Sequence, residues 1–349
     1  MTDRKRPIRV LVVDDSALVR KAINDCLARD PELEVVGTAP DPYVAREKIA
    51  RLDPDVITLD LEMPRMDGLT FLRILMEHHP LPVVVVSSLA QAGSQAALDA
   101  VDAGAVDVLA KPDGTMSLGG IADRLAWHVK AAAAAGRHLR RRPAAILPPS
   151  RPMPPTAAPG SRQLIVIGAS TGGVGALRQL LPVLPPGLPP IAIVQHISAS
   201  FSKAVADRLA ETSALAVREA GHDEPLLPGE CVIAPGGRHL AIEYRGGFRT
   251  RLVDSPPLHH CRPAVDVLFR SAAEAAGGDA LGVLLTGMGS DGALGLQAIR
   301  GAGGRTIAED ESSCVVFGMP RAAIDLGVVD RVVPLPGMAA AIVEAACRR

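Results

Sequence analysis

The stretch Gln163–Leu181, QLIVIGASTGGVGALRQLL, lies near the middle of the 349-residue chain and determines how the second half folds. An apolar run comes first, a turn rich in glycine follows, and the stretch ends in a helical pattern of apolar residues. The turn contains Gly168, Ser170, Gly172 and Gly173. A turn of this kind between a strand and a helix serves either as a cradle for phosphate or as the elbow that presents a nucleophilic serine in the order G-x-S-x-G.

The residue that ends the next strand distinguishes these two functions. A dinucleotide cradle needs an acidic residue there, about 20 residues after the glycines, to bind a ribose hydroxyl. The next apolar run, IAIVQH, ends in Gln195 and His196 instead. A neutral imidazole cannot replace that carboxylate, but it can deprotonate a serine. The pattern therefore favours Ser170 as a nucleophile.

A third member of this site is predicted in the stretch LGVLLTGMGSDG, residues 281–292, where Asp291 follows a strongly apolar strand in a glycine-rich loop. Side chains at the carboxyl ends of parallel strands meet at one edge of a sheet. We therefore expect Ser170 as the nucleophile, His196 as the general base and Asp291 as the group that orients the base. Taken singly, these residues could instead be a helix N-cap, a packed histidine and a turn former. The chain order Ser, His, Asp differs from that of the α/β-hydrolases and the serine proteases, which indicates a convergent arrangement.

Strands and helices alternate in both halves of the chain. Between residues 8 and 110 the apolar runs are IRVLVV, EVVGTA, VITLD, PVVVVSS and VDVLA, separated by helical patterns such as ALVRKAINDCLAR. Runs of this kind form parallel sheets covered on both faces, and five of them fit a flavodoxin-like sheet. The later runs LIVIGA, IAIVQH, ECVIAP and LGVLLTG predict a second doubly wound, mostly parallel α/β domain.

The alternation stops between the two halves. Residues 136–162 hold seven prolines and six arginines but no acidic residue. Proline fixes φ and removes a hydrogen-bond donor, so we expect a semi-extended linker whose arginines are solvated or dock on a partner. The predicted organisation is a domain over residues 1–130, a linker over 131–162 and a second domain over 163–349.

Three carboxylates are predicted at the carboxyl edge of the first sheet. Asp14 and Asp15 follow the first strand, and Asp60 ends the third. Such a cluster repels itself unless a cation joins it, and hard oxygen ligands suit Mg²⁺. Ser87 ends the fourth strand and Lys111 follows the fifth, which adds a hydroxyl and an ammonium. This set indicates a phospho-acceptor site, the alternative being carboxylates that merely cap helices.

Composition limits the compartment and the partners. With 37 basic and 38 acidic residues the net charge is −1, so neither nucleic acid nor an anionic membrane is an expected partner. No apolar run is long enough to be a signal peptide or a membrane span. Five scattered cysteines without C-x-x-C spacing indicate reduced thiols and a cytoplasmic protein. The run His259–Cys261 is not expected to bind zinc, because adjacent residues point in different directions.

The first half resembles the receiver domain of two-component response regulators over residues 8 to about 130. The matching motifs are VVDDS, TLDLEMPRMDG, VVVVSS and AKP. The resemblance implies that Asp60 is phosphorylated by a sensor histidine kinase and that Asp14 and Asp15 bind Mg²⁺ together with it. It also implies that Ser87 and Lys111 sense the phosphoryl group.

Almost the whole chain resembles the chemotaxis response regulators with protein-glutamate methylesterase and glutamine deamidase activity. The motifs in the second half are GASTGG, VQHISASF, IAPGGRHL, RPAVDVLF, LLTGMGSDGA and TIAEDESSCVVFGMPRAAI. The resemblance implies a phosphorylation-activated serine hydrolase that acts on chemoreceptor helices without a cofactor for hydrolysis. The backbone N–H of Met288 is the implied oxyanion donor. Where the family usually has histidine or another polar residue before RPSVD, this chain has Cys261, and Ala264 replaces the serine.

The alternative functions are a signalling adaptor that binds a nucleotide and a receiver-controlled DNA-binding regulator. The first lacks the acidic residue at the strand end, and the second lacks a helix-turn-helix pattern and a basic charge. In a receiver-controlled hydrolase, we expect the receiver to cover the edge that carries Ser170 until Asp60 is phosphorylated.

Overall fold

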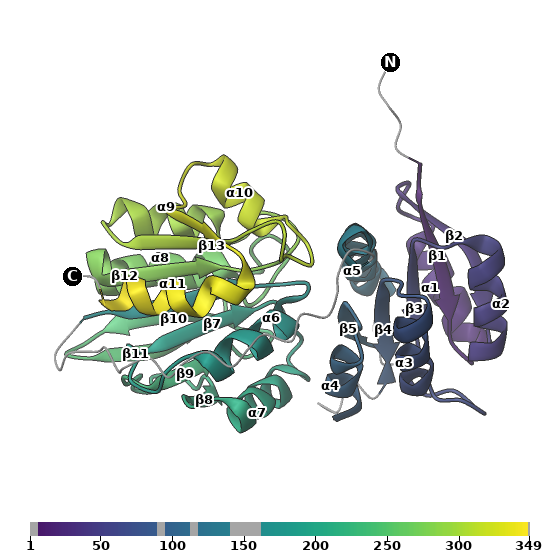
Figure 1. Cartoon of the computed structure of the whole chain (residues 1–349), viewed down its shortest axis with the longest axis horizontal. Helices are drawn as coiled ribbons and strands as arrows, with labels where there is room; N and C mark the ends of the chain where they lie inside the picture. Colours follow the sequence, from purple (N-terminus) through teal and green to yellow (C-terminus); the bar gives the residue numbers. More distant parts are fainter. Residues whose placement is uncertain (1–5, 89–94, 112–117, 140–161, 348–349) are drawn as a thin grey trace, which may run out of the picture. The chain divides into compact units, whose positions relative to one another are not determined.

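The computed structural model of the chain describes residues 6–88, 95–111, 118–139 and 162–347. The chain divides into two compact units, Met1–Pro143 and Ala144–Arg349. Each unit is built on a parallel sheet of its own (Figure 1). No described helix combines the length and the apolar character that crossing a bilayer requires.

The first unit contains a five-stranded parallel sheet in the order β2-β1-β3-β4-β5, as the flavodoxin-like prediction requires. Its strands are β1 (Ile8–Val13), β2 (Leu33–Ala39), β3 (Val56–Leu59), β4 (Val83–Ser87) and β5 (Asp107–Ala110). Its helices are α1 (Ala17–Leu27), α2 (Pro42–Leu52), α3 (Gly68–His78), α4 (Gln95–Asp102) and α5 (Leu118–Leu139). The central strands β1 and β3 are buried where they face the helices, which explains their near-continuous apolar sequence.

The predicted domain boundary at residue 130 falls inside α5, which continues to Leu139. Ala131, Ala132 and Ala135 are fully buried, so the helix continues to cover the core with small side chains. Alanine has the highest helix propensity, and this run extends the helix into the first part of the predicted linker. The remainder of that linker, residues 140–161, lies outside the described residues.

The second unit contains a seven-stranded parallel sheet in the order β14-β13-β12-β6-β7-β9-β8, and a separate antiparallel hairpin, β10-β11. The expectation of a mostly parallel α/β domain is confirmed. The strands are β6 (Leu164–Ala169), β7 (Ile191–Gln195), β8 (Ala216–Glu219), β9 (Glu230–Ile233), β10 (His239–Tyr244), β11 (Phe248–Val253), β12 (Ala280–Leu284), β13 (Arg305–Glu309) and β14 (Arg331–Val333). The helices are α6 (Gly173–Leu180), α7 (Ser202–Thr212), α8 (Val265–Ala276), α9 (Ala293–Gly301), α10 (Met319–Asp325) and α11 (Leu335–Cys347), with short 3-10 turns at Leu181–Val183 and Gly277–Asp279.

Helices cover both faces of this sheet. In Figure 1, α8, α9 and α10 lie on one side, and α6, α7 and α11 lie on the other. Alternate residues of β6 pack in opposite directions, and Leu164 and Val166 share a core cluster with Leu268 and Phe269 of α8. Because both faces are covered, β6 is buried along its whole length.

The order in which strands are added to this sheet changes side at β6. From β6 the chain adds β7 on one side, and after α8 it returns to add β12 on the other. Leu284 of β12 pairs with Gly168, and Gln195 of β7 pairs with Ala169, so all three strands end at one level. The carboxyl edge at such a reversal is where open α/β sheets bind their ligands.

Candidate active site

Ser170 lies in a sharp turn between β6 and α6. Its N–H donates to the carbonyl of Thr286 at 3.0 Å, and its own carbonyl accepts the N–H of Gly173 at 2.7 Å. The N-cap of α6 is Gly172, which has a φ of 79°. Ser170 therefore precedes the cap position, and its hydroxyl is not used to start the helix.

Two glycines allow the chain to turn this tightly. A side chain at Gly172 would need an unfavourable left-handed backbone and would overlap Val315. A Cβ atom at Gly173 would overlap the side chain of Gln195. Gln195 itself donates from Nε2 to the carbonyl of Ser170 at 2.9 Å, which fixes the turn against β7. Gly172 and Gly173 are therefore required because Val315 and Gln195 pack directly against the turn.

The structure brings the three predicted hydrolase residues together. Oγ of Ser170 lies 3.1 Å from Nδ1 of His196, and Nε2 of His196 lies 2.8 Å from Oδ2 of Asp291. With a proton on Nε2, the ring donates to the carboxylate and leaves Nδ1 free to accept the serine proton. The two ring nitrogens are exchanged relative to the chymotrypsin triad, in which the serine faces Nε2.

The predicted phospho-acceptor residues also converge, at the carboxyl edge of the first sheet. Nζ of Lys111 lies 2.6 Å from Asp60 and 2.8 Å from Asp14. One oxygen from each of Asp14, Asp15 and Asp60 lies within 4.8 Å of the others. The N–H of Lys111 donates to the carbonyl of Ser87 at 3.1 Å, so these two residues are neighbours across β4 and β5.

This acidic cluster fits a divalent cation. Burial raises the pKa of Asp14 by more than its contacts with Lys111 lower it, so its carboxylate lacks full compensation. Oδ1 of Asp60 is buried and has no hydrogen-bond partner among the described residues. A buried oxygen of this kind is stabilised when a metal ion binds it.

Both units match known protein families. Residues 165–342 match the CheB methylesterase family, and residues 10–119 match the response regulator receiver domain. The chain belongs to the CheB methylesterase family.

A protein-glutamate methylesterase/protein-glutamine glutaminase of Anaeromyxobacter dehalogenans is 51% identical over 98% of this chain and 96% of its own length. One from Syntrophus aciditrophicus is 48% identical over 97% of this chain and 98% of its own. The crystal structure of the Thermotoga maritima CheB methylesterase catalytic domain is 41% identical, covers 52% of this chain and 97% of its own, and has a TM-score of 0.51.

In this member of the CheB family the pKa of the histidine is raised and the pKa of the aspartate is lowered. Burial lowers the pKa of His196, but hydrogen bonds and charge from Asp291 and Cys261 raise the pKa by more, to about 10. Burial raises the pKa of Asp291, but His196 and two backbone N–H groups lower it below its ordinary value. The pair therefore stabilises an imidazolium beside a carboxylate, which is the state that a proton transfer from Ser170 to the ring would produce.

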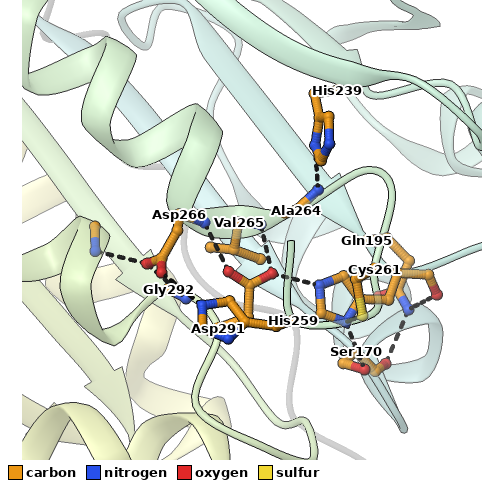
Figure 2. Close-up of polar contacts among 12 residues, drawn as sticks. Ser170, Gln195, His239, His259, Cys261, Ala264, Val265, Asp266, Asp291 and Gly292 are labelled. Carbon is orange, nitrogen blue, oxygen red and sulfur yellow. Dashed lines mark hydrogen bonds and ion pairs between the residues drawn. The ribbon is translucent and has the colours of Figure 1, made fainter. Parts of the chain in front are cut away.

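Asp266 holds Asp291 in place from the first turn of α8. The backbone N–H groups of Val265 and Asp266 donate to Asp291 at 2.7 Å and 2.9 Å. The carboxylate of Asp266 in turn accepts the N–H groups of Gly292 and Gly295 at 2.9 Å and 2.6 Å. Figure 2 shows Asp266 and Asp291 side by side, joined by these bonds. The loop that carries Asp291 is thus tied to α8 in both directions.

The sequence pattern does not single out Asp266, although the residue lies within the motif RPAVDVLF. One feature of the sequence could have identified it. Asp266 is an acidic residue in the first turn of a helix, and it stands three positions before Phe269, so both lie on the helix face that is buried in the core. One ligand atom from each of His259, Asp266 and Asp291 lies within 4.8 Å of the others. Three of the four carboxylate oxygens already accept backbone N–H groups, so hydrogen bonding accounts for this cluster without a metal.

Cys261 is a second residue of the site that the sequence does not assign a role. Its Sγ lies 3.4 Å from Nδ1 of His196, the same nitrogen that faces Ser170. The side chain is half-buried. The sulfur of Cys261 is therefore in direct contact with the proposed base.

Met288 lies in the loop between β12 and Asp291. Its neighbour Gly287 packs against the serine, since a Cβ atom on Gly287 would lie 2.7 Å from Cβ of Ser170. The carbonyl of Gly287 accepts N–H groups from Gly318 and Met319 at 3.0 Å and 2.8 Å, which fixes this part of the loop. Within the described part of the chain, the N–H of Met288 donates no hydrogen bond.

Proposed function

We propose that this chain hydrolyses glutamate methyl esters, and deamidates glutamines, on the cytoplasmic helices of chemoreceptors. The observation that carries the proposal is the chain of contacts from Ser170 through His196 to Asp291, within a domain of the CheB methylesterase family. The names of the curated relatives, protein-glutamate methylesterase/protein-glutamine glutaminase, support the substrate class. The five cysteines are free thiols, as expected for an enzyme working in the cytoplasm.

In the first half of the reaction, Oγ of Ser170 attacks the ester carbonyl while its proton passes to Nδ1 of His196. The resulting imidazolium is stabilised by Asp291 at 2.8 Å. The proton then passes from Nδ1 to the methoxy oxygen, the bond between that oxygen and the acyl carbon breaks, and methanol leaves. An acyl-enzyme ester on Ser170 remains.

In the second half, a water molecule gives a proton to Nδ1 and its oxygen attacks the acyl carbon. The bond to Oγ breaks, the proton returns to Ser170, and a glutamate side chain is released. With glutamine as substrate the first leaving group is ammonia, which leaves less readily than methanol. We therefore expect deamidation to be the slower reaction.

The negative charge that develops on the carbonyl oxygen needs a hydrogen-bond donor beside Ser170. We assign this role to the backbone N–H of Met288, which has no partner among the described residues and follows a glycine packed on the serine. A fixed backbone donor of this kind typically contributes about 3–4 kcal/mol to transition-state stabilisation.

We assign control of the hydrolase to the receiver unit. An oxygen of Asp60 bonds to phosphorus as the bond to a histidine nitrogen of a sensor kinase breaks. Asp14, Asp15 and Asp60 would hold Mg²⁺, which would neutralise charge on the phosphoryl group. Lys111, already 2.6 Å from Asp60, would bind a phosphoryl oxygen together with the hydroxyl of Ser87.

Phosphorylation is then expected to relieve an inhibitory contact of the receiver with the edge that carries Ser170. A methyl ester offers little surface for recognition, so the surrounding receptor helices must provide most of the binding energy. Restricting access to the serine therefore controls the reaction without altering its chemistry.

The proposal is tested by methanol release from membranes that contain methylated chemoreceptors, with and without a small phosphodonor. Ser170→Ala should lower the rate by at least about a thousandfold, as the loss of a triad nucleophile does. Ser213→Ala, at the C-terminal end of α7, serves as a control and should retain the rate. Near-full methanol release by Ser170→Ala would refute the proposed function.

A further inference from the structure

We infer that Cys261 is a positioning residue for this reaction, because its sulfur and the Ser170 hydroxyl share Nδ1 of His196 and the sulfur stabilises the protonated ring. The inference rests on the proposed function and adds to it a group that controls the base. It starts from the two contacts to Nδ1, at 3.1 Å from the hydroxyl and 3.4 Å from the sulfur.

Cys261 is presented to the ring by a strained turn. Leu258 and Cys261 exchange two backbone hydrogen bonds, of 3.1 Å and 2.9 Å, which close the turn over residues 259 and 260. His259 and His260 have φ angles of 52° and 62°, a left-handed conformation that glycine or asparagine usually supplies. Such strain costs on the order of 1 kcal/mol or more per residue and persists only where surrounding contacts impose it.

Contacts with two buried residues, Asp266 and His239, hold this turn. Nε2 of His259 lies 3.1 Å from Asp266, which holds the tip of the turn. The buried ring of His239 holds the two ends, since Nδ1 accepts the N–H of Ala264 at 3.1 Å and Nε2 donates to the carbonyl of Pro256 at 3.1 Å. Figure 2 shows His239 beside Ala264, and Cys261 between this anchor and Ser170. The sulfur is therefore held in a fixed place.

The same anchor fixes the other partner of the ring. Asp266 binds both His259 of the strained turn and the loop of Asp291, so the sulfur and the carboxylate are held relative to one another on opposite sides of His196. A backbone that maintains strain to place one side chain at a reacting group indicates a role for that side chain in the reaction.

The chemistry of the site gives the sulfur such a role. When Ser170 loses its proton, the new N–H at Nδ1 faces two acceptors, the serine oxygen and the polarisable sulfur of Cys261. Ser170, Cys261 and Asp291 are the groups that face the ring, and Asp266 and His259 lie one contact further away. Burial lowers the pKa of His196, whereas Asp291 and Cys261 raise it.

Removing the sulfur should therefore make His196 easier to deprotonate. Below its pKa the ring is protonated and cannot accept the serine proton, so the rate falls on the acidic side of the pH profile. A lower pKa moves this acidic limb to lower pH. A thiol that donated its proton to Nδ1 would instead stabilise the neutral ring, and its removal would move the limb to higher pH.

The test is the pH dependence of kcat/KM for methanol release by the phosphodonor-treated full chain, from about pH 6 to 11, a range that spans the pKa of about 10 of His196. Cys261→Ala should move the acidic limb down by at least about half a pH unit, a roughly threefold gain at low pH relative to its own plateau. Cys261→Ser, which keeps an acceptor, should move it less. Cys347→Ala, on an exposed thiol, should leave the limb unchanged.

Titration of the His196 ring protons by NMR in the same variants gives a second measurement that does not require turnover. A downward shift of that titration in Cys261→Ala supports the inference even if the variant is slow. An unchanged or upward titration and limb would refute it. The two proposals fail separately, because an active Ser170→Ala would refute the hydrolase assignment whatever Cys261 does.

Discussion

Asp266 and Asp291 are two buried carboxylates joined by a backbone hydrogen bond of 2.9 Å, from the N–H of Asp266 to Oδ1 of Asp291. Among the described residues no lysine or arginine pairs with either acid, and both are satisfied largely by backbone N–H groups at the starts of α8 and α9. The positive ends of two helix dipoles therefore converge on them. The position of the proposed triad acid depends on a second acid that takes no part in the proton transfers.

Asp266→Ala should destabilise the second unit and slow the reaction. The change leaves the N–H groups of Gly292 and Gly295 without their acceptor, at about 1–3 kcal/mol for each buried donor. Calorimetry should show a lower unfolding temperature for the second unit, and kcat should fall because Asp291 is no longer held. Asp279→Ala, at an exposed acid after α8, is the control. Unchanged stability would show that water can replace this carboxylate.

Two glycines separated by three positions should respond in opposite ways to the same substitution. Gly172→Ala adds a side chain at a φ of 79° and against Val315, so we expect a loss of more than about 1 kcal/mol and of most activity. Gly175→Ala adds a methyl group in open space inside α6, where it should stabilise by about 0.5–1 kcal/mol. Urea unfolding of the second unit checks both, and equal effects would contradict the close approach at Gly172.

The sequence could predict that Ser170, His196 and Asp291 come together because all three follow strands of one parallel sheet. The register pairs Gly168 with Leu284 and Ala169 with Gln195, so Ser170, His196 and the loop that leads to Asp291 all leave the sheet at one edge. Strand ends are visible as the limits of apolar runs, and this information is local in the sequence. The same reasoning brought Asp14 and Asp60 together in the first unit.

Cys261 and Asp266 could not be placed in this way. Cys261 reaches the site through a turn with left-handed histidines, a conformation that residue preferences argue against. Asp266 is a buried acid whose carboxylate accepts a hydrogen bond from Gly292, which lies 26 residues later in the chain. A local sequence pattern cannot reveal a contact over this separation. The hairpin β10–β11 was likewise not predicted, although its buried His239 anchors the turn of Cys261. The predicted linker begins at residue 131 and therefore includes the buried alanines of α5.

Asp60→Asn should abolish activation by a phosphodonor and leave the unstimulated rate unchanged. The amide cannot form the acyl phosphate, and it also weakens the contact with Lys111. Asp53→Asn is a matched control, since Asp53 is exposed and has a φ of 41°, which asparagine tolerates. Phosphate-affinity electrophoresis and methanol release should show the difference, and removal of Mg²⁺ with a chelator should have the same effect as Asp60→Asn. If the Asp60→Asn variant were still phosphorylated, the phosphoryl acceptor would be a residue other than Asp60.

The contact between His196 and Asp291 should make the second unit less stable at alkaline pH. The pKa of His196 is raised from 6.5 to about 10 on folding, so the stability gained from its protonation is fully present below pH 6.5 and is lost as the pH rises toward about 10. The pKa of Asp291 is lowered from 3.8, so its contribution is present above pH 3.8 and is lost only in stronger acid. The pair is thus most stabilising between these limits.

Hydrogen exchange of the β6 and β12 amides measures this effect locally, which the single tryptophan cannot do, because Trp127 lies in α5 of the first unit. After correction for intrinsic exchange, protection should fall between about pH 6.5 and 9.5 in the parent chain. In Asp291→Asn the carboxylate that raises the pKa of His196 is absent, so the fall should be much smaller. An equal fall in both chains would show that the histidine proton contributes nothing to the stability of this edge.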